Sequence, residues 1–309
     1  MVDRSLIEHL KTKTGINEKK LEALVSYDLN DDSEIPLTLP ERKSVIDAID
    51  SLRLLDPACG SGAFPIGALQ KIVWILQRVD ADCELWLEKK LAKVPELYKQ
   101  KIRKDATTNP FDYTRKLDVI KNSIFGVDIQ PIAVEIARLR CFLTLVVESE
   151  VNDSKPNRGV DPLPNLDFKF VCANTLIPAP EESNDGQRLF TDDFEEKLSA
   201  AVDRYFSSFG ASKSSAGNDI HRLIDSKVDE QLRYVRNLIS HSDERYQAVL
   251  AKTHKKSIDT HTHVLTLWAS YKNLFENKPV GFFDPKYFFP GVKNGFDIVI
   301  GNPPYAKVS

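Results

Sequence analysis

The tetrapeptide at residues 302–305 combines an amide side chain, two prolines and an aromatic ring directly after an apolar run. The prolines Pro303 and Pro304 fix the backbone and withhold two N–H donors. The side-chain oxygen of Asn302 and the carbonyl oxygen of Pro303 can then both accept from one exocyclic NH2 group. Accepting both protons exposes the nitrogen lone pair to an electrophilic methyl group, so positioning does most of the work. Tyr305 offers a face on which an extruded base can stack; a proline turn after a strand is the alternative.

A second cluster of unusual residues, DPACGSGAF, follows another short apolar run. Its glycines can take backbone angles closed to other residues, and the helix that follows presents free N–H groups. Pro65 breaks a GxGxxG fingerprint, and no Lys-Ser/Thr pair marks a phosphate-binding loop. An acid at the strand end suits a cationic ligand better than a pyrophosphate, and a tight strand-to-helix turn is the alternative. The residues that we predict to contact the ligand are Asp56, Pro57, Ala58, Cys59, Gly60, Ser61, Gly62 and Phe64.

Two further polar positions follow apolar runs. In the segment GVDIQP, Asp128 is placed to accept hydrogen bonds from two ribose hydroxyls, and capping of the next helix is the alternative. In the segment CANTL, Asn174 can accept from an adenine amino group, and an Asx turn is the alternative. Their neighbours Ile129 and Thr175 complete the predicted pocket.

These positions lie on elements that alternate along the chain. Four short apolar runs predict buried strands, at residues 52–56, 124–128, 168–172 and 296–301. Helical spacing follows the first two runs, with Ile66, Leu69, Val73 and Leu76 on one helix, and Ile132, Ile136, Leu139 and Leu143 on one face of a helix that begins near Pro131. The alternation predicts an α/β fold with a mostly parallel sheet. Ligands bind such sheets at the carboxyl ends of the strands, where every motif above lies.

Helices are predicted for most of the remaining chain. Asn17 is expected to cap one helix, and Glu41–Ser51 to form another before the first strand. From residue 177 to 277 helical faces replace the strand pattern, with a flexible break predicted at 207–219. We therefore predict three parts: an N-terminal helical segment at 1–50, a discontinuous core at 51–176 and 277–309, and a helical insertion at 177–276.

The composition is that of an ordinary globular protein. Of 309 residues, 42% are hydrophobic and 28% charged, and no apolar run reaches the roughly 18 residues of a membrane span. The start lacks the apolar segment of a signal peptide, and the four cysteines form neither a CxxC pair nor a metal-ligand spacing, so we expect a cytoplasmic protein without a metal. A formal charge of −3 argues against holding DNA by bulk electrostatics, although a local basic face would suffice.

The segments DPACGSGAF, FGVDIQP, ANTL and FDIVIGNPPY stand in one order along the chain. This pattern resembles adenine-specific DNA methyltransferases of gamma-type motif order, in particular the methylase part of type IIG restriction-modification enzymes and related phage-defence methylases. The resemblance covers residues 51–176 and 280–309. It implies a Rossmann-like core, S-adenosylmethionine as cofactor, and double-stranded DNA with a flipped adenine as substrate, methylated at N6. The catalytic residues that it implies are Asn302, Pro303, Pro304 and Tyr305.

The sequence departs from the family pattern in three ways. Asn174 stands where the family usually has Asp, although an amide oxygen can still accept from adenine. No GxYYTP-like segment precedes the first motif. The chain ends at Ser309, so we expect a truncated sheet, no target-recognition region, and little methylation by this chain alone. The fourth strand should then lie at an edge, in the order third, second, first, fourth, and be covered by the insertion or paired with a second copy.

Two other hypotheses stay open: a catalytically silent module that binds cofactor, DNA or protein, and a methyltransferase acting on RNA or on a protein glutamine. Three weaker signals are more typical of ordinary structure. The basic stretch 89–104 could track phosphates but is more typical of a solvated helix face. His261 and His263 lack further metal ligands. Glu88 and Lys90 form an ExK among other helix charges and do not make a convincing nuclease site.

Overall fold

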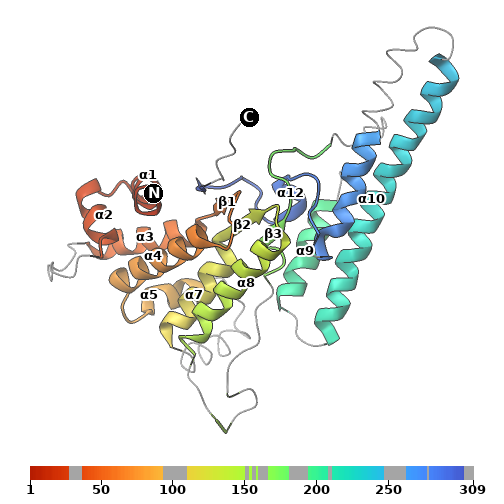
Figure 1. Ribbon diagram of the computed structural model, residues 1–309. Coiled ribbons are helices and arrows are strands. Elements are labelled where there is room, and N and C mark those ends of the chain that lie inside the picture. The colour runs from red at the N-terminus through yellow and green to blue at the C-terminus, as the bar shows by residue number, and fades with distance from the viewer. Residues whose placement is uncertain are drawn as a thin grey trace. The chain divides into compact units, whose positions relative to one another are not determined.

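The computed structural model describes most of the chain (Figure 1): residues 1–27, 37–92, 110–149, 153–154, 158, 166–180, 194–207, 211–246, 262–276 and 278–302. The chain forms two compact units. The first comprises Met1–Gly126, Ala133–Lys169 and Gly295–Ser309, and the second comprises Val127–Ile132 and Phe170–Asn294. The division into three parts that the sequence suggests stays a prediction.

Four short strands form one sheet, and the strand β2 passes through both units. The strands are β1 (Leu54–Asp56), β2 (Ile124–Asp128), β3 (Phe170–Cys172) and β4 (Ile298–Val299), in the order β3-β2-β1-β4. β1 pairs in parallel with β2 on one side and with β4 on the other, where Leu54 lies opposite Ile124 and Ile298. The predicted α/β class, the parallel sheet and the strand order are confirmed. Three of the strands are shorter than their apolar runs.

Helices make up most of the first unit. They are α1 (Val2–Thr14), α2 (Glu18–Val25), α3 (Leu39–Ser51), α4 (Ala63–Val79), α5 (Glu84–Ala92), α7 (Phe111–Asn122) and α8 (Pro131–Val146), whose first two residues belong to the second unit. As predicted, Asn17 caps α2, accepting from the Lys19 N–H at 2.9 Å. The apolar face of α4 is buried at Leu69, Val73 and Leu76, as the helical spacing predicted.

A capping box begins α3. The Thr38 hydroxyl accepts from the Glu41 N–H, and the Glu41 carboxylate accepts from the Thr38 N–H at 2.7 Å. The ammonium group of Lys20, 2.8 Å away, and the Thr38 N–H lower the pKa of Glu41 to about 2. Glu41 is therefore ionised at neutral pH, and the capping box stays complete.

Replacing Thr38 with Ala should lower the free energy of unfolding by about 1 kcal/mol, because α3 loses its side-chain cap. Thr12→Ala is the matched control: this exposed hydroxyl donates to the Glu8 carbonyl within α1 and caps nothing. Its loss should leave stability nearly unchanged. Urea unfolding of both variants measures the difference, and equal effects would argue against the capping role of Thr38.

The face of α8 that carries the predicted apolar stripe points to solvent. Ile132, Ile136, Leu139 and Leu143 are between 38% and 66% exposed. The buried face of the helix consists instead of Val134, Ala137, Cys141 and Leu145, which are mostly smaller. α8 is apolar on both faces, so periodicity identifies its helical character but not which face is buried.

The basic stretch predicted at 89–104 lies partly outside the described residues. Its first two lysines form ion pairs within the unit: Lys89 contacts Asp47 and Asp50, and Lys90 contacts Asp50 and Asp118 at 2.7 and 2.8 Å. These contacts connect α3, α5 and α7. For these two residues the charges serve packing between helices.

The second unit contains mainly helices after β3. They are α9 (Phe194–Ser207), α10 (Ala211–Tyr246), a helix at 262–270, the 3-10 helix η2 (Tyr271–Phe275) and α12 (Pro285–Phe288), and Figure 1 shows α9 lying beside the much longer α10. The break predicted at 207–219 is wrong over residues 211–219, which form the start of α10. The small and polar residues of this segment suggested flexibility. The segment is helical because Ala216 and Ile220 are buried in the second unit, and such contacts outweigh low helix propensity.

An aromatic cluster forms the core of the second unit. Trp268, Tyr271, Phe282 and Tyr287 are buried, with ring centroids 5.5–5.9 Å apart. The Tyr271 hydroxyl donates to the Tyr287 carbonyl at 2.6 Å, and burial raises the pKa of Tyr271, which keeps the proton in place. Trp268 and Tyr271 are therefore core residues of the second unit, as their helical spacing suggested.

No helix in the described parts of the chain is long and apolar enough to cross a membrane. The same residues contain no group of three His, Cys, Asp or Glu side chains that could hold a metal ion. His261 lies outside the described residues.

Candidate functional site

The glycine turn between β1 and α4 requires glycine at two positions. Gly60 has a φ of 53° and Gly62 a φ of 86°, which side-chain-bearing residues rarely adopt. At Gly62 a Cβ atom would lie 3.0 Å from the Cβ of Ala137 in α8, so the turn is also packed tightly against that helix. Gly62 precedes α4 with no side-chain cap. The first N–H groups of α4 are thus left for a ligand or water.

Asp56 lies at the carboxyl end of β1 and is 1% exposed. One of its carboxylate oxygens accepts from the Ala58 N–H at 3.1 Å, which fixes the start of the turn. Cys59 is also buried, whereas Pro57, Ala58, Gly60, Ser61 and Phe64 are partly exposed. The predicted contact residues of this segment therefore run from the end of β1 through the turn to the start of α4, and most of them have surface left for a ligand.

The chain returns to this turn at the end of β4. A Cβ atom on Gly301 would lie 3.0 Å from the Oδ1 atom of Asp56 and 3.5 Å from the Cδ atom of Pro57. A residue with a Cβ atom at this position would require the Asp56 carboxylate to shift by a few tenths of an ångström. Sequence reasoning included Gly301 in a strand and missed this role; the signal was a glycine standing directly before NPPY. Asn302 follows and is exposed, while Pro303, Pro304 and Tyr305 lie outside the described residues.

Asp297 fastens the start of the same segment to its neighbours. Its carboxylate accepts from the Arg53 N–H at 2.9 Å and lies 3.1 Å from the ammonium group of Lys13. Although burial acts to raise the pKa of Asp297, the Arg53 N–H and the Lys13 charge hold it below its usual value of 3.8. The contacts tie the strand before Asn302 to β1 and to α1.

The Asp297 contacts predict a pH-dependent loss of stability. A carboxylate with a lowered pKa in the folded state stabilises the protein above its ordinary pKa, and this contribution disappears as the pH falls. Wild type should therefore be more stable than Asp297→Asn near neutral pH, and the two should converge well below pH 3.8. Urea unfolding at both pH values measures the gap. A gap of the same size under both conditions would contradict the assignment.

The second unit contains the other two predicted polar positions. Asp128 ends β2, and its carboxylate accepts from the Gln130 N–H at 2.8 Å. The Asn174 side-chain oxygen accepts from the Leu176 N–H at 3.1 Å. The backbone N–H of Asn174 donates to the Val280 carbonyl at 3.0 Å. The Asx turn considered for Asn174 is therefore present. An amide oxygen has two acceptor positions, so the turn leaves capacity for a ligand.

Ile129 and Thr175 flank these two positions. Ile129 is 53% exposed although it is a large apolar residue, and Thr175 is partly exposed. Backbone hydrogen bonds join their neighbours, since the Ala173 N–H donates to the Asp128 carbonyl at 3.0 Å. The ends of β2 and β3 thus present one acid, one amide and an apolar side chain at the surface of the second unit.

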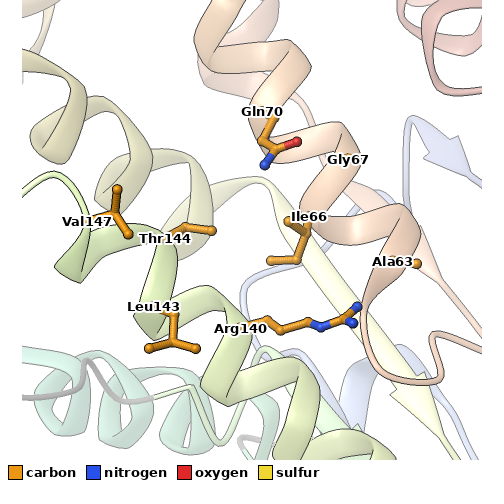
Figure 2. A pocket seen from close by; sticks show the side chains of 8 residues that line it. All are labelled: Ala63, Ile66, Gly67, Gln70, Arg140, Leu143, Thr144 and Val147. Carbon is orange, nitrogen blue, oxygen red and sulfur yellow. The ribbon is translucent and has the colours of Figure 1, made fainter.

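A groove of about 400 Å³ runs along the outer faces of α4 and α8 (Figure 2). It is lined by Ala63, Ile66, Gly67, Gln70, Arg140, Leu143, Thr144 and Val147. Figure 2 shows the Arg140 side chain extending along the groove toward the start of α4. None of the turn residues predicted to bind the ligand lines this groove, so it is distinct from the glycine turn.

Residues 122–309, more than half of the chain, match the Eco57I restriction-modification methylase family. The chain belongs to this family. A proposed type II restriction enzyme and methyltransferase of Methanocaldococcus jannaschii is 36% identical over 149 residues, which are 48% of this chain and 10% of that protein. The chain thus spans about a tenth of the length of this curated relative. No solved structure matches the chain.

Membership of the Eco57I methylase family agrees with the fold. The small parallel sheet with helices is that of a methyltransferase, and the matched residues contain β2, β3, β4 and the NPPY segment. The matched range begins after the glycine turn, which the structure nevertheless brings against Gly301 of the matched part. The resemblance to a restriction-modification methylase is therefore confirmed.

Proposed function

We propose that this protein transfers a methyl group from S-adenosylmethionine to the N6 amino group of an adenine flipped out of double-stranded DNA. The proposal rests chiefly on the close approach of Gly301 to Asp56. A segment that can bind an amino group through Asn302 leaves the sheet directly beside a glycine turn suited to a cofactor. Membership of the Eco57I restriction-modification methylase family supports the same chemistry.

The cofactor fits the residues that are present. The positive φ angles of Gly60 and Gly62 let a ligand approach the main chain, and the uncapped start of α4 offers N–H donors. The acid of Asp56 suits a ligand that carries positive charge. Asp128 would hold the ribose hydroxyls, and the oxygen of Asn174 would accept from the adenine amino group. When bound, S-adenosylmethionine supplies an electrophilic methyl group.

The chain's own residues would prepare the acceptor nitrogen. The Asn302 side-chain oxygen and the Pro303 carbonyl oxygen would each accept a hydrogen bond from the adenine amino group, which exposes the nitrogen lone pair. One N–H proton would leave for solvent once the new N–C bond has formed. The two prolines hold these acceptors in place, so orientation replaces a strong base. Tyr305 stacks on the flipped base. Pro304 contributes the second fixed peptide of the turn.

Replacing Asp128 with Ala tests the cofactor assignment. Loss of the ribose acceptor should weaken binding of S-adenosylmethionine by about 1–3 kcal/mol, because hydroxyl groups of the ligand lose their partner. The control is Asp82→Asn, which alters an exposed carboxylate outside the predicted pocket. Calorimetry gives both affinities. Unchanged affinity in the Asp128 variant would refute its ribose role.

Analysis of the methylated product separates the proposal from its alternatives. The natural protein that carries this chain is incubated with a labelled methyl donor and, separately, with adenine-containing duplex DNA, RNA or protein. The expected product is N6-methyladenine in DNA alone. Label in RNA or in protein glutamine, or cofactor binding without any transfer, would favour one of the other hypotheses.

A further inference from the structure

A second groove of about 400 Å³ lies within the second unit, between α9 and α10. Lys197, Ala200 and Arg204 of α9 line one wall, and Asp219, Arg222 and Leu223 of α10 line the other. Ala200 and Leu223 contribute apolar surface, whereas the remaining side chains are charged. The lining of the groove therefore consists of charged side chains around a small apolar area.

Positive charge is in excess in this groove. Three basic side chains face one acid, which gives its lining a formal charge of +2. The Asp219 carboxylate lies 3.4 Å from the Arg222 guanidinium and 3.8 Å from the Arg204 guanidinium. The Asp219 carboxylate therefore holds the two guanidinium groups near one another.

The basic groups are accessible to a large ligand. The side chains of Arg204 and Arg222 are 64% and 79% exposed, whereas Asp219 is 36% exposed. The excess charge is also local, because α9 as a whole carries three acids and two bases. Its acids Glu195, Glu196 and Asp203 do not line the groove. The site is thus a confined positive patch on a protein whose formal charge is −3.

We propose that this groove, formed by Lys197, Arg204 and Arg222 around Asp219, binds a backbone phosphate of duplex DNA. Guanidinium groups form paired hydrogen bonds with phosphate oxygens, and lysine adds a point charge. Contacts to phosphate orient a duplex without reading its sequence. The choice of DNA as the source of the phosphate rests on the proposed function. The groove assigns a substrate-holding role to the helical insertion.

Two double variants test the groove in the full chain. Arg204→Ala with Arg222→Ala removes two charges from it, and Arg233→Ala with Arg236→Ala removes two from exposed positions farther along α10. Both pairs change the net charge equally. Anisotropy of a labelled duplex over a salt series should show binding weakened about three- to tenfold in the groove variant, with a salt slope smaller by about one per lost phosphate contact. The control should bind nearly as wild type does.

Asp219→Asn gives a result of opposite sign. Removing the acid raises the positive charge of the groove, so duplex binding should tighten by about two- to fivefold at low salt. A residue with only a structural role would not improve binding when altered. Inorganic phosphate replacing chloride at equal ionic strength should not displace the duplex selectively. Selective displacement would mean a site for the free anion and would overturn the assignment to DNA.

Equal weakening in the two double variants, or unchanged binding in Asp219→Asn, would also overturn the proposal. Cofactor calorimetry on the same samples separates this inference from the proposed function. A chain that binds S-adenosylmethionine but no duplex contradicts the groove alone. A chain whose duplex binding depends on the groove, but which binds no cofactor, supports the groove and contradicts the methyltransferase proposal.

Discussion

Replacing Asn302 with Ala is expected to reduce methyl transfer to adenine by at least about 10²–10³-fold, the loss typical when a group that stabilises the transition state is removed. The variant loses the acceptor that holds one proton of the amino group, so the nitrogen lone pair stays conjugated with the ring. Affinity for S-adenosylmethionine should be unchanged, since Asn302 is exposed and follows the end of β4. Single-turnover transfer of a labelled methyl group, in a preparation whose wild type methylates DNA, measures the rate.

The conservative variant Asn302→Asp separates chemistry from structure. A carboxylate also accepts hydrogen bonds from an amino group, so this variant should retain much more activity than Asn302→Ala. Equal loss in both variants would point to a structural role for the side chain. Near-normal transfer by Asn302→Ala would refute the proposed mechanism outright.

Gly62→Ala is expected to lower the free energy of unfolding by about 2–5 kcal/mol. A left-handed backbone costs a residue with a Cβ atom about 1–2 kcal/mol, and overpacking adds about 1–3 kcal/mol. The overpacking arises because the new Cβ would lie 3.0 Å from that of Ala137. Cofactor binding should fall with stability, since the turn has to shift. Gly60→Ala is the control: its φ is also positive, but no atom lies within 4 Å of the added Cβ.

The double variant Gly62→Ala with Ala137→Gly tests the contact between the turn and α8. Ala137→Gly alone should cost about 1 kcal/mol, because glycine disfavours the helix interior. Combined with Gly62→Ala it removes the closest contact, at 3.0 Å, and leaves the one with the Ala137 Cα atom, at 3.2 Å. The double variant should therefore lose less stability than the sum of the two single losses. Urea unfolding of the four proteins yields this coupling. Strict additivity would mean that the turn does not pack against Ala137.

The sequence predicts β1, β2 and β3 well because nearly all of their residues are buried, on both faces of the sheet. The apolar runs around Leu55 and Phe125 are short and lie between turn residues, which is typical of buried strands. Both runs form strands, and these pair in parallel as neighbours, as expected. Chain order and crossover rules then place β3 and β4 on opposite sides. Three strands are shorter than the predicted runs, because a residue counts as part of a strand only where a neighbouring strand pairs with it. The second strand alone keeps its full predicted extent.

Features that depend on tertiary packing could not be predicted in the same way. α8 has apolar side chains on two faces, and burial of the smaller set around Ala137 follows from the close approach of Gly62. The segment 211–219 contains three serines and one glycine yet is helical, since Ala216 and Ile220 pack inside the second unit. Local propensity is weak where such contacts compensate.

Part of the candidate site was accessible from residue types alone. The positive φ of Gly60 and Gly62 follows from glycines in a strand-to-helix turn. The contact of Gly301 with Asp56 could not be derived, because it joins residues more than two hundred positions apart. The basic groove was equally hidden, since Arg204 and Arg222 are separated in sequence by ordinary surface residues and come together only when α9 packs on α10.

Titration of the chain with S-adenosylmethionine, followed by calorimetry, tests the central claim most directly. We expect one cofactor bound per chain, displaced by the demethylated product, which presents the same ribose and adenine groups to Asp128 and Asn174. A folded chain that takes up no cofactor even at millimolar concentration would contradict the proposed cofactor site. It would leave the glycine turn as a structural connection between β1 and α4.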